Sequence, residues 1–211
     1  MSLFQKKTVE HSQNFTLGNA KTLVIVGLGN PGKEYDKTRH NIGFDCLDAL
    51  RDSQTEFTPW QVKKNLFCIE STGSFGDTKV ILIKPTTFMN ESGKSVRAIL
   101  DYYKLPVSSL TAVHDELDIV FGQIRTRVGG SSAGHNGIKS ITNQISAEYG
   151  RVRIGILGIK PTQMDTADYV LAKFSSEELI NLSLLKREVQ SILIELIYRR
   201  ELYPDTRNFL L

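Results

Sequence analysis

Five short polar segments of this chain carry the side chains best suited to chemistry. They are Asn30, 38–41 (Thr-Arg-His-Asn), 85–90 (Pro-Thr-Thr-Phe-Met-Asn), 114–118 (His-Asp-Glu-Leu-Asp) and 134–137 (Gly-His-Asn-Gly). An imidazole titrates near neutrality and can take a proton from water, and a carboxylate behind it fixes its tautomer. A histidine and an aspartate brought together from these segments would therefore form a general base.

The four histidines differ in their surroundings. His11 lies in a polar N-terminal segment, and His114 ends an apolar run, which is more typical of a hydrogen-bonded core histidine than of a catalyst. His40 precedes a predicted helix, whereas His135 lies in a glycine-rich loop. The residues alone leave His40 and His135 as alternative bases.

Other chemistries have less support. The chain has no G-x-S-x-G nucleophile elbow, no P-loop lysine and no HExxH zinc motif. Its two cysteines, Cys46 and Cys68, lack a paired spacing and sit among apolar residues, so we expect small core residues rather than a disulfide or zinc site. We expect water attack directed by a His–Asp pair, with no metal and no cofactor.

A glycine-rich turn at 27–32 matches the dinucleotide fingerprint G-x-G-x-x-G after a strand. That motif requires a helix to begin inside the turn, but Pro31 and Gly32 interrupt it and residues 33–40 show no helical periodicity. We expect the glycines instead to allow a tight backbone path that holds Asn30 at the strand end. A dinucleotide-dependent oxidoreductase is the least favoured alternative.

The elements that must position these residues follow from hydrophobic patterning. Strands are expected at 21–26, 65–71, 78–84, 110–113, 123–128 and 151–157. Helices are expected after an Asn41 cap, at 90–104, at 138–147, and from a capping box at Ser175 and Glu178 to about residue 200. The alternation predicts a single-domain α/β/α sandwich, and the hairpin around 73–77 predicts a mixed, twisted sheet. Three of the five polar segments then directly follow an apolar strand.

Length and composition suit one globular domain, with 211 residues, 40% apolar and 23% charged. We expect a flexible extension at 1–20, the domain at 21–203 and a tail at 204–211. No apolar run approaches the roughly 18 residues of a membrane span. We expect a cytoplasmic protein, with a mitochondrial one as the alternative because the extension could be an organellar presequence.

The polar segments, taken in order, resemble a known family. Residues 26–32 (Val-Gly-Leu-Gly-Asn-Pro-Gly), 38–41, 84–90, 114–118 and 134–137 are similar in order and spacing to the motifs of the bacterial-type peptidyl-tRNA hydrolases. The similarity covers about residues 22–200. The resemblance implies an esterase that cleaves the bond joining a peptide to the 3′ end of tRNA.

The resemblance also implies roles for single residues. His40 would be the general base, and Asp115 would orient it. The residues implied at the substrate are Asn30, Tyr35, Phe88, Met89, Asn90 and Asn136. The residues implied at the tRNA are Arg127 and Arg153, and we expect Lys139 to join them because it lies close in the chain. The implied partner is the acceptor stem and 3′ end of peptidyl-tRNA, bound by a monomer.

A second function class remains open at this level. An RNA-binding module that kept this fold would retain the basic residues and not the activity. The chain also departs from the family where Ser131, Ser132 and Ala133 stand in place of further glycine or a histidine.

Overall fold

The computed structural model describes residues 22–158 and 164–210, so the expected N-terminal extension lies outside the described residues. The strands are β1 (Thr22–Gly27), β2 (Gln61–Lys63), β3 (Cys68–Phe75), β4 (Thr78–Pro85), β5 (Leu110–Val120), β6 (Gln123–Val128), β7 (Gly150–Leu157) and β8 (Asp205–Asn208). The helices are α1 (Ile42–Ser53), α2 (Ser92–Tyr103), α3 (Asn136–Ile145), α4 (Thr166–Leu171) and α5 (Ser176–Arg199).

All eight strands form one sheet in the order β2-β3-β4-β1-β5-β7-β6-β8. The four central strands, β4, β1, β5 and β7, are parallel, while the strands on both sides pair antiparallel. The prediction of a mixed sheet is confirmed. The hairpin between β3 and β4 is the reason, because it reverses the chain before the parallel core resumes.

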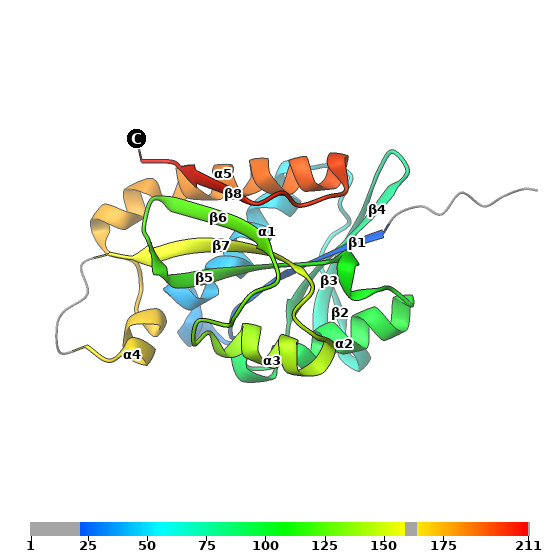
Figure 1. Ribbon diagram of the computed structural model, residues 1–211, viewed down its shortest axis with the longest axis horizontal. Helices are drawn as coiled ribbons and strands as arrows, with labels where there is room; N and C mark the ends of the chain where they lie inside the picture. Colours follow the sequence, from blue (N-terminus) through cyan, green and yellow to red (C-terminus); the bar gives the residue numbers. More distant parts are fainter. Residues whose placement is uncertain (1–21, 159–163, 211) are drawn as a thin grey trace, which may run out of the picture.

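Helices cover both faces of the sheet (Figure 1). One face packs on α1 and α5 through apolar side chains such as Leu47 and Leu193, and the other packs on α2 and α3 through Val96 and Ile138. Each of these four helices buries an apolar stripe against the sheet, as its periodicity predicts. The predicted α/β/α sandwich is therefore confirmed.

Helix α5 begins where the sequence predicts. The Ser175 hydroxyl accepts the backbone N–H of Glu178 at 3.2 Å, and the Glu178 carboxylate accepts that of Ser175 at 2.7 Å. This capping box pairs donors that every helix N-terminus leaves without an intrahelical partner. Across the described parts of the chain, we find no helix with the length and apolar character needed to cross a membrane.

Strand β5 is longer than predicted, and this changes where two polar residues lie. It runs to Val120, so His114 and Asp115 lie within the strand rather than after it. Parallel pairing with β7 continues to Glu116, and an irregularity in register follows before Val120. These polar residues can be buried in the strand because they are hydrogen-bonded: Asp115 to His40 and His135, and His114 to the backbone carbonyl of Asp115.

Three short elements were not predicted, namely β2, α4 and β8, because three to six residues are too few to show a hydrophobic period. Strand β8 lies in the segment expected as a C-terminal tail, and it pairs with β6. Arg207 in β8 forms ion pairs with Glu188 and Glu195 of α5 at 3.0 and 2.8 Å. This part of the chain therefore belongs to the sheet.

The glycine-rich turn after β1 contains no helix start, and α1 begins only at Ile42. A Cβ on Gly27 would lie 2.4 Å from the carbonyl oxygen of Gly43, and one on Gly29 would lie 2.8 Å from the Phe44 ring. The glycines at 27 and 29 therefore permit close packing of α1 on β1, and not the special backbone path that we expected. In the turn itself, Gly32 alone has a left-handed φ, of +116°.

Candidate active site

The carboxyl ends of the four parallel strands meet at one edge of the sheet, which is where open α/β sheets place ligand sites. Segments following β1, β4 and β7, the end of β5 and residues 133–136 at the start of α3 line a cleft of about 620 Å³. The lining residues are Asn30, His40, Phe88, Met89, Asn90, Asp115, Glu116, Leu117, Ala133, Gly134, His135, Asn136, Asp165, Thr166, Ala167, Val170 and Leu171. Most of the residues predicted at the substrate thus lie together.

His40 and Asp115 are in contact, although 75 positions separate them in the chain. The Nδ1 atom of His40 lies 3.0 Å from each carboxylate oxygen of Asp115. The carboxylate accepts, so Nδ1 carries the proton in the neutral ring and Nε2 keeps its lone pair. Nε2 has no partner among the described residues, and the ring lines the cleft. This is the arrangement that a general base requires.

His135 contacts the same carboxylate but differs in its other nitrogen. Its Nδ1 accepts the backbone N–H groups of Gly137 at 3.0 Å and Ile138 at 3.3 Å, and so caps α3. Its proton therefore lies on Nε2, which is 3.0 Å from an Asp115 oxygen. Both nitrogens of His135 are occupied. The geometry thus favours His40 over His135 as the base, a choice that the residues alone left open.

The Asp115 carboxylate determines the electrostatics of the pair. Burial alone would lower the pKa of His40, but attraction to Asp115 and the hydrogen bond with it outweigh burial and raise that pKa above its ordinary value. Burial would raise the pKa of Asp115, yet the two histidines hold it well below its usual range. Asp115 thus stays ionised while His40 titrates.

His114 lies in the core, as predicted. Its side chain is 1% exposed, and its Nδ1 lies 2.7 Å from the carbonyl oxygen of Asp115. Burial lowers the pKa of His114 well below its ordinary value, with His135 contributing in the same direction. Its ring packs edge-on against His135, with centroids 4.8 Å apart. It supports the site from behind and does not reach the cleft.

The ligand atoms of His40, Asp115 and His135 lie within 4.8 Å of one another, which is close enough to share a metal ion. A zinc ligand must offer a deprotonated nitrogen. The Nε2 of His135 instead carries its proton, because two backbone N–H groups occupy its other nitrogen. The hydrogen-bonded arrangement therefore suits proton transfer better than metal ligation.

Side-chain amides and apolar groups surround the pair. Asn90 and Asn136 line the cleft and are exposed, Met89 is buried beneath them, and Phe88 projects at the rim, 54% exposed. Tyr35 does not line the cleft itself. It packs edge-on against Phe88, with centroids 6.3 Å apart, and so supports the rim. Asn136 is the first residue of α3 and not part of the preceding loop.

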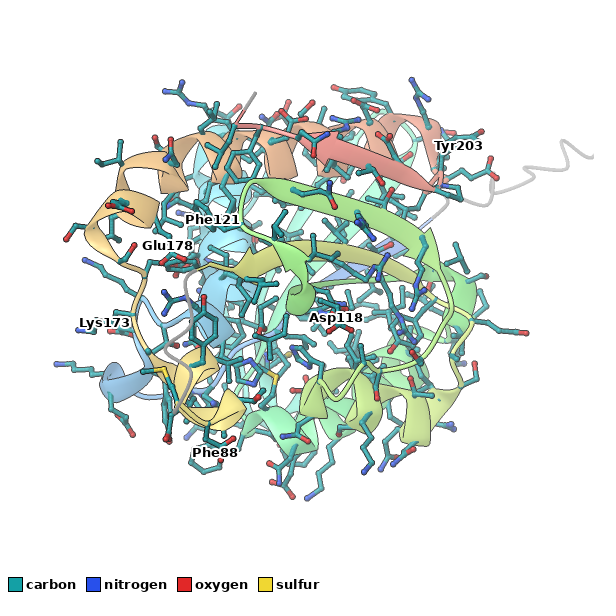
Figure 2. All side chains as sticks on the ribbon, turned by 60° about the vertical axis from the view of Figure 1, so that its left-hand side comes forward. Phe88, Asp118, Phe121, Lys173, Glu178 and Tyr203 are labelled. Atoms are coloured by element: carbon teal, nitrogen blue, oxygen red, sulfur yellow. The ribbon has the colours of Figure 1, made fainter. Side chains whose placement is uncertain are left out.

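One wall of the cleft comes from α4, which sequence reasoning missed. Arg39 holds this wall: its guanidinium donates to the Lys173 carbonyl at 2.7 Å and to the Glu178 carboxylate at 2.6 Å, and it stacks on the Tyr169 ring at 4.4 Å. Figure 2 shows Lys173 on the segment between α4 and α5 and Glu178 in the first turn of α5, with Phe88 below α4. Arg39 is the chain neighbour of His40, so the same turn of chain positions both the α4 wall of the cleft and the His40 imidazole.

A basic face lies beside the cleft. Arg127 pairs with Arg151 and Arg125 with Arg153 across β6 and β7, so the four side chains point to the same side of the sheet. The alternate positions of these strands pack under α5. Arg153 also lies 3.9 Å from the Glu116 carboxylate. The spacing R-x-R in both strands was the available signal, but only Arg127 and Arg153 were singled out from it.

Lys139 lies on α3, which covers the same side of the sheet, and its side chain is exposed. Arg151 is almost fully buried, and its guanidinium donates to the Ser131 carbonyl at 2.6 Å. The Nε atoms of Arg127, Arg151 and Arg153 have no hydrogen-bond partner among the described residues. Cations gathered in this way suit a polyanion.

Comparisons with known proteins agree with this geometry. A family profile described as peptidyl-tRNA hydrolase matches residues 24–208. A peptidyl-tRNA hydrolase of Rickettsia bellii is 45% identical over 159 residues, covering 75% of this chain and 84% of that protein. The Pelagibacter ubique enzyme of that name is 41% identical over 187 residues, covering 88% and 98% of the two chains.

Solved structures give the same result. The crystal structure of peptidyl-tRNA hydrolase from Acinetobacter baumannii superimposes with a TM-score of 0.70 at 34% identity, covering 87% of this chain and 96% of that one.

Proposed function

Because this chain belongs to the peptidyl-tRNA hydrolase family and is a hydrolase, we propose that it cleaves the ester bond of peptidyl-tRNA by general-base catalysis. The observation that carries the mechanism is the contact of His40 with the buried Asp115 at 3.0 Å, with Nε2 free at the cleft. The products are a free peptide and a tRNA ready for reuse.

The proposed chemistry needs one base and no covalent intermediate. Nε2 of His40 takes a proton from water as the water oxygen attacks the ester carbonyl. Asp115 stabilises the imidazolium that forms. When the tetrahedral intermediate collapses, the imidazolium returns the proton to the 3′ oxygen of the tRNA, and the C–O bond breaks. Proton and electron pairs balance without an added group.

We further propose that side-chain amides give the enzyme a preference for N-acylated substrates. An amide both donates and accepts, so Asn90 and Asn136 suit the carbonyl and N–H of a peptide. Asn30, with its side-chain amide at the cleft, suits the developing oxyanion. A free α-ammonium offers no carbonyl to these groups, which would spare ordinary aminoacyl-tRNA.

The basic face is proposed to bind the tRNA acceptor stem. Arg127 and Arg153 carry this role by resemblance to the family. Lys139, which lies close in the chain, is proposed to join them, and Arg125 shares their side of the sheet. Basic side chains neutralise phosphates and release the counterions condensed on the nucleic acid, and such contacts carry no sequence readout. We propose a monomer working in the cytoplasm, with the mitochondrion as the alternative.

The test is the release of an N-acetylated amino acid from tRNA by a His40→Ala variant. Loss of a general base is expected to lower kcat by about 10²–10⁴-fold, while tRNA binding and the unfolding transition stay near those of the wild type. A His11→Ala variant is the matched control. Unchanged turnover in His40→Ala would remove His40 from this role, and tight tRNA binding by an inactive wild type would favour the RNA-binding module instead.

A further inference from the structure

The side chain of Asn41 forms hydrogen bonds with both backbone polar groups of Asn30. Its Oδ1 accepts the backbone N–H of Asn30 at 2.8 Å, and its Nδ2 donates to the backbone carbonyl of Asn30 at 2.9 Å. Asn41 is 4% exposed, so water does not compete for either bond. The sequence predicts this asparagine as the cap of α1, but its side chain makes no capping hydrogen bond.

These hydrogen bonds hold the Asn30 backbone and so help to set which atom of the Asn30 amide faces the cleft. The Oδ1 of Asn30 accepts the backbone N–H of Met89 at 2.7 Å, which assigns the oxygen to the inner side of the amide. The Nδ2 of Asn30 has no partner among the described residues, and Asn30 lines the cleft. With its backbone and its oxygen both held, Asn30 offers one rigid N–H donor group there.

We propose that Asn41 is a positioning residue for the hydrolysis, acting through Asn30. The proposal rests on the proposed function, because the donor matters only if an acceptor forms in the cleft. Asn41 directly follows His40 in the 3₁₀ turn Arg39–Asn41. One turn of chain therefore sets the base and, through Asn41, the Nδ2 donor of Asn30. A donor held in advance stabilises a transition state without the cost of ordering it.

A double-mutant cycle tests this inference. The variants are Asn30→Ala, Asn41→Ala and the two combined, assayed for kcat on N-acetyl-aminoacyl-tRNA. If Asn41 acts only through Asn30, it has nothing to position once Asn30 is alanine. We expect Asn41→Ala to lose roughly tenfold or more, and the double variant to lie within about threefold of Asn30→Ala. If the fold-loss of kcat in the double variant equals the product of the two single losses, the inference is overturned.

The pH–rate profile separates positioning from a general structural effect. The midpoint of the pH–rate profile should stay at the wild-type value in Asn41→Ala, because the side-chain hydrogen bonds of Asn41 go to Asn30 and not to His40 or Asp115. A shifted midpoint would mean that the whole turn has moved, and it would contradict the inference. Asn143→Ala, at an exposed position on α3, is the matched control and should change neither kcat nor the midpoint of the pH–rate profile.

Asn41→Asp keeps the cycle usable if Asn41→Ala does not fold. The aspartate is isosteric and still accepts the Asn30 N–H, but it places an oxygen against the Asn30 carbonyl. We expect Asn41→Asp to reduce kcat in the wild-type background and to have no further effect on kcat in the Asn30→Ala background. A wild type without ester turnover would refute the proposed function itself, whereas multiplying losses in an active wild type would refute only the role of Asn41.

Discussion

At the scale of single residues, the two histidines on Asp115 differ in the nitrogen that faces away from it. That nitrogen in His135 accepts two backbone N–H groups of α3, whereas in His40 it is open to the cleft. The capping bonds hold His135 as a donor to Asp115. The carboxylate thus receives one N–H from each ring, which compensates its burial and leaves His40 free to exchange a proton.

The pH dependence of the proposed hydrolysis follows from these contacts. His40 must be unprotonated to act, so kcat/KM is expected to rise with pH through a midpoint above the ordinary histidine value, because Asp115 raises the pKa of His40. Asp115→Asn removes the charge and leaves burial, which lowers that pKa. We expect the midpoint to fall and kcat to drop by about 10²–10⁴-fold.

The measurement is ester release between about pH 5 and 9 in the presence of a chelator. A midpoint that stays in place in Asp115→Asn would show that another group titrates. Strict dependence of the rate on a divalent metal would contradict the proton-transfer mechanism.

At the scale of elements, the position of α3 decides whether His135 and Asn136 reach the cleft. A Cβ on Gly137 would lie 2.5 Å from the Met89 sulfur and 3.0 Å from the His135 ring. The helix can therefore approach the segment after β4 only because this residue is glycine. The contact is one of packing, since Gly137 has an ordinary helical backbone.

Gly137→Ala should destabilise the protein, although alanine is the better helix former. The added methyl group must displace either the buried Met89 side chain or α3, and overpacking of this kind costs about 1–3 kcal/mol. Helix propensity alone would give a gain of roughly 0.5–1 kcal/mol. Urea unfolding measures the sign, with the exposed Asn143→Ala on the same helix as control. A more stable Gly137→Ala would contradict this close packing.

At the scale of the whole molecule, the basic face lies on the side of the sheet opposite α5. If it binds tRNA phosphates, Arg127→Ala and Arg153→Ala should weaken tRNA binding and reduce the slope of log Kd against log salt by about one each. The rate at saturating substrate should change little, because neither residue lines the cleft. Arg187→Ala, exposed on α5, is the control and should leave the slope unchanged.

The stability of the whole fold should respond to acid in opposite ways through two histidines. The pKa of His114 is depressed in the folded protein, so only the unfolded chain takes its proton below about pH 6.5, and stability is lost as pH falls. The pKa of His40 is raised, so its contribution is present at low pH and is lost as pH rises through the folded value.

Urea unfolding at about pH 7.5 and 5 separates the two effects. On acidification, His114→Gln should lose less of its free energy of unfolding than the wild type, and His40→Ala should lose more. Equal losses in both variants would show that neither histidine contributes to the pH dependence.

Sequence patterning determined the elements with enough residues to show a period. The strand at 21–26, the helix begun by the Ser175 capping box and the alternation that makes an α/β/α sandwich all follow from local spacing. The ordered polar motifs also predicted which residues gather, because parallel strands bring their carboxyl ends to one edge. Short elements such as α4 escaped, since six residues carry no period.

Only the tertiary structure shows how the gathered groups are hydrogen-bonded. The geometric reason to favour His40 over His135 lies in backbone N–H groups of α3, and the Asn41 side chain bonds a backbone segment 11 positions away. A hydrogen bond needs a direction and a distance, which long-range packing sets and residue spacing does not encode. The residue types indicate which chemistry is possible, and the hydrogen-bond partners in the folded protein indicate which nitrogen of His40 and of His135 carries the proton.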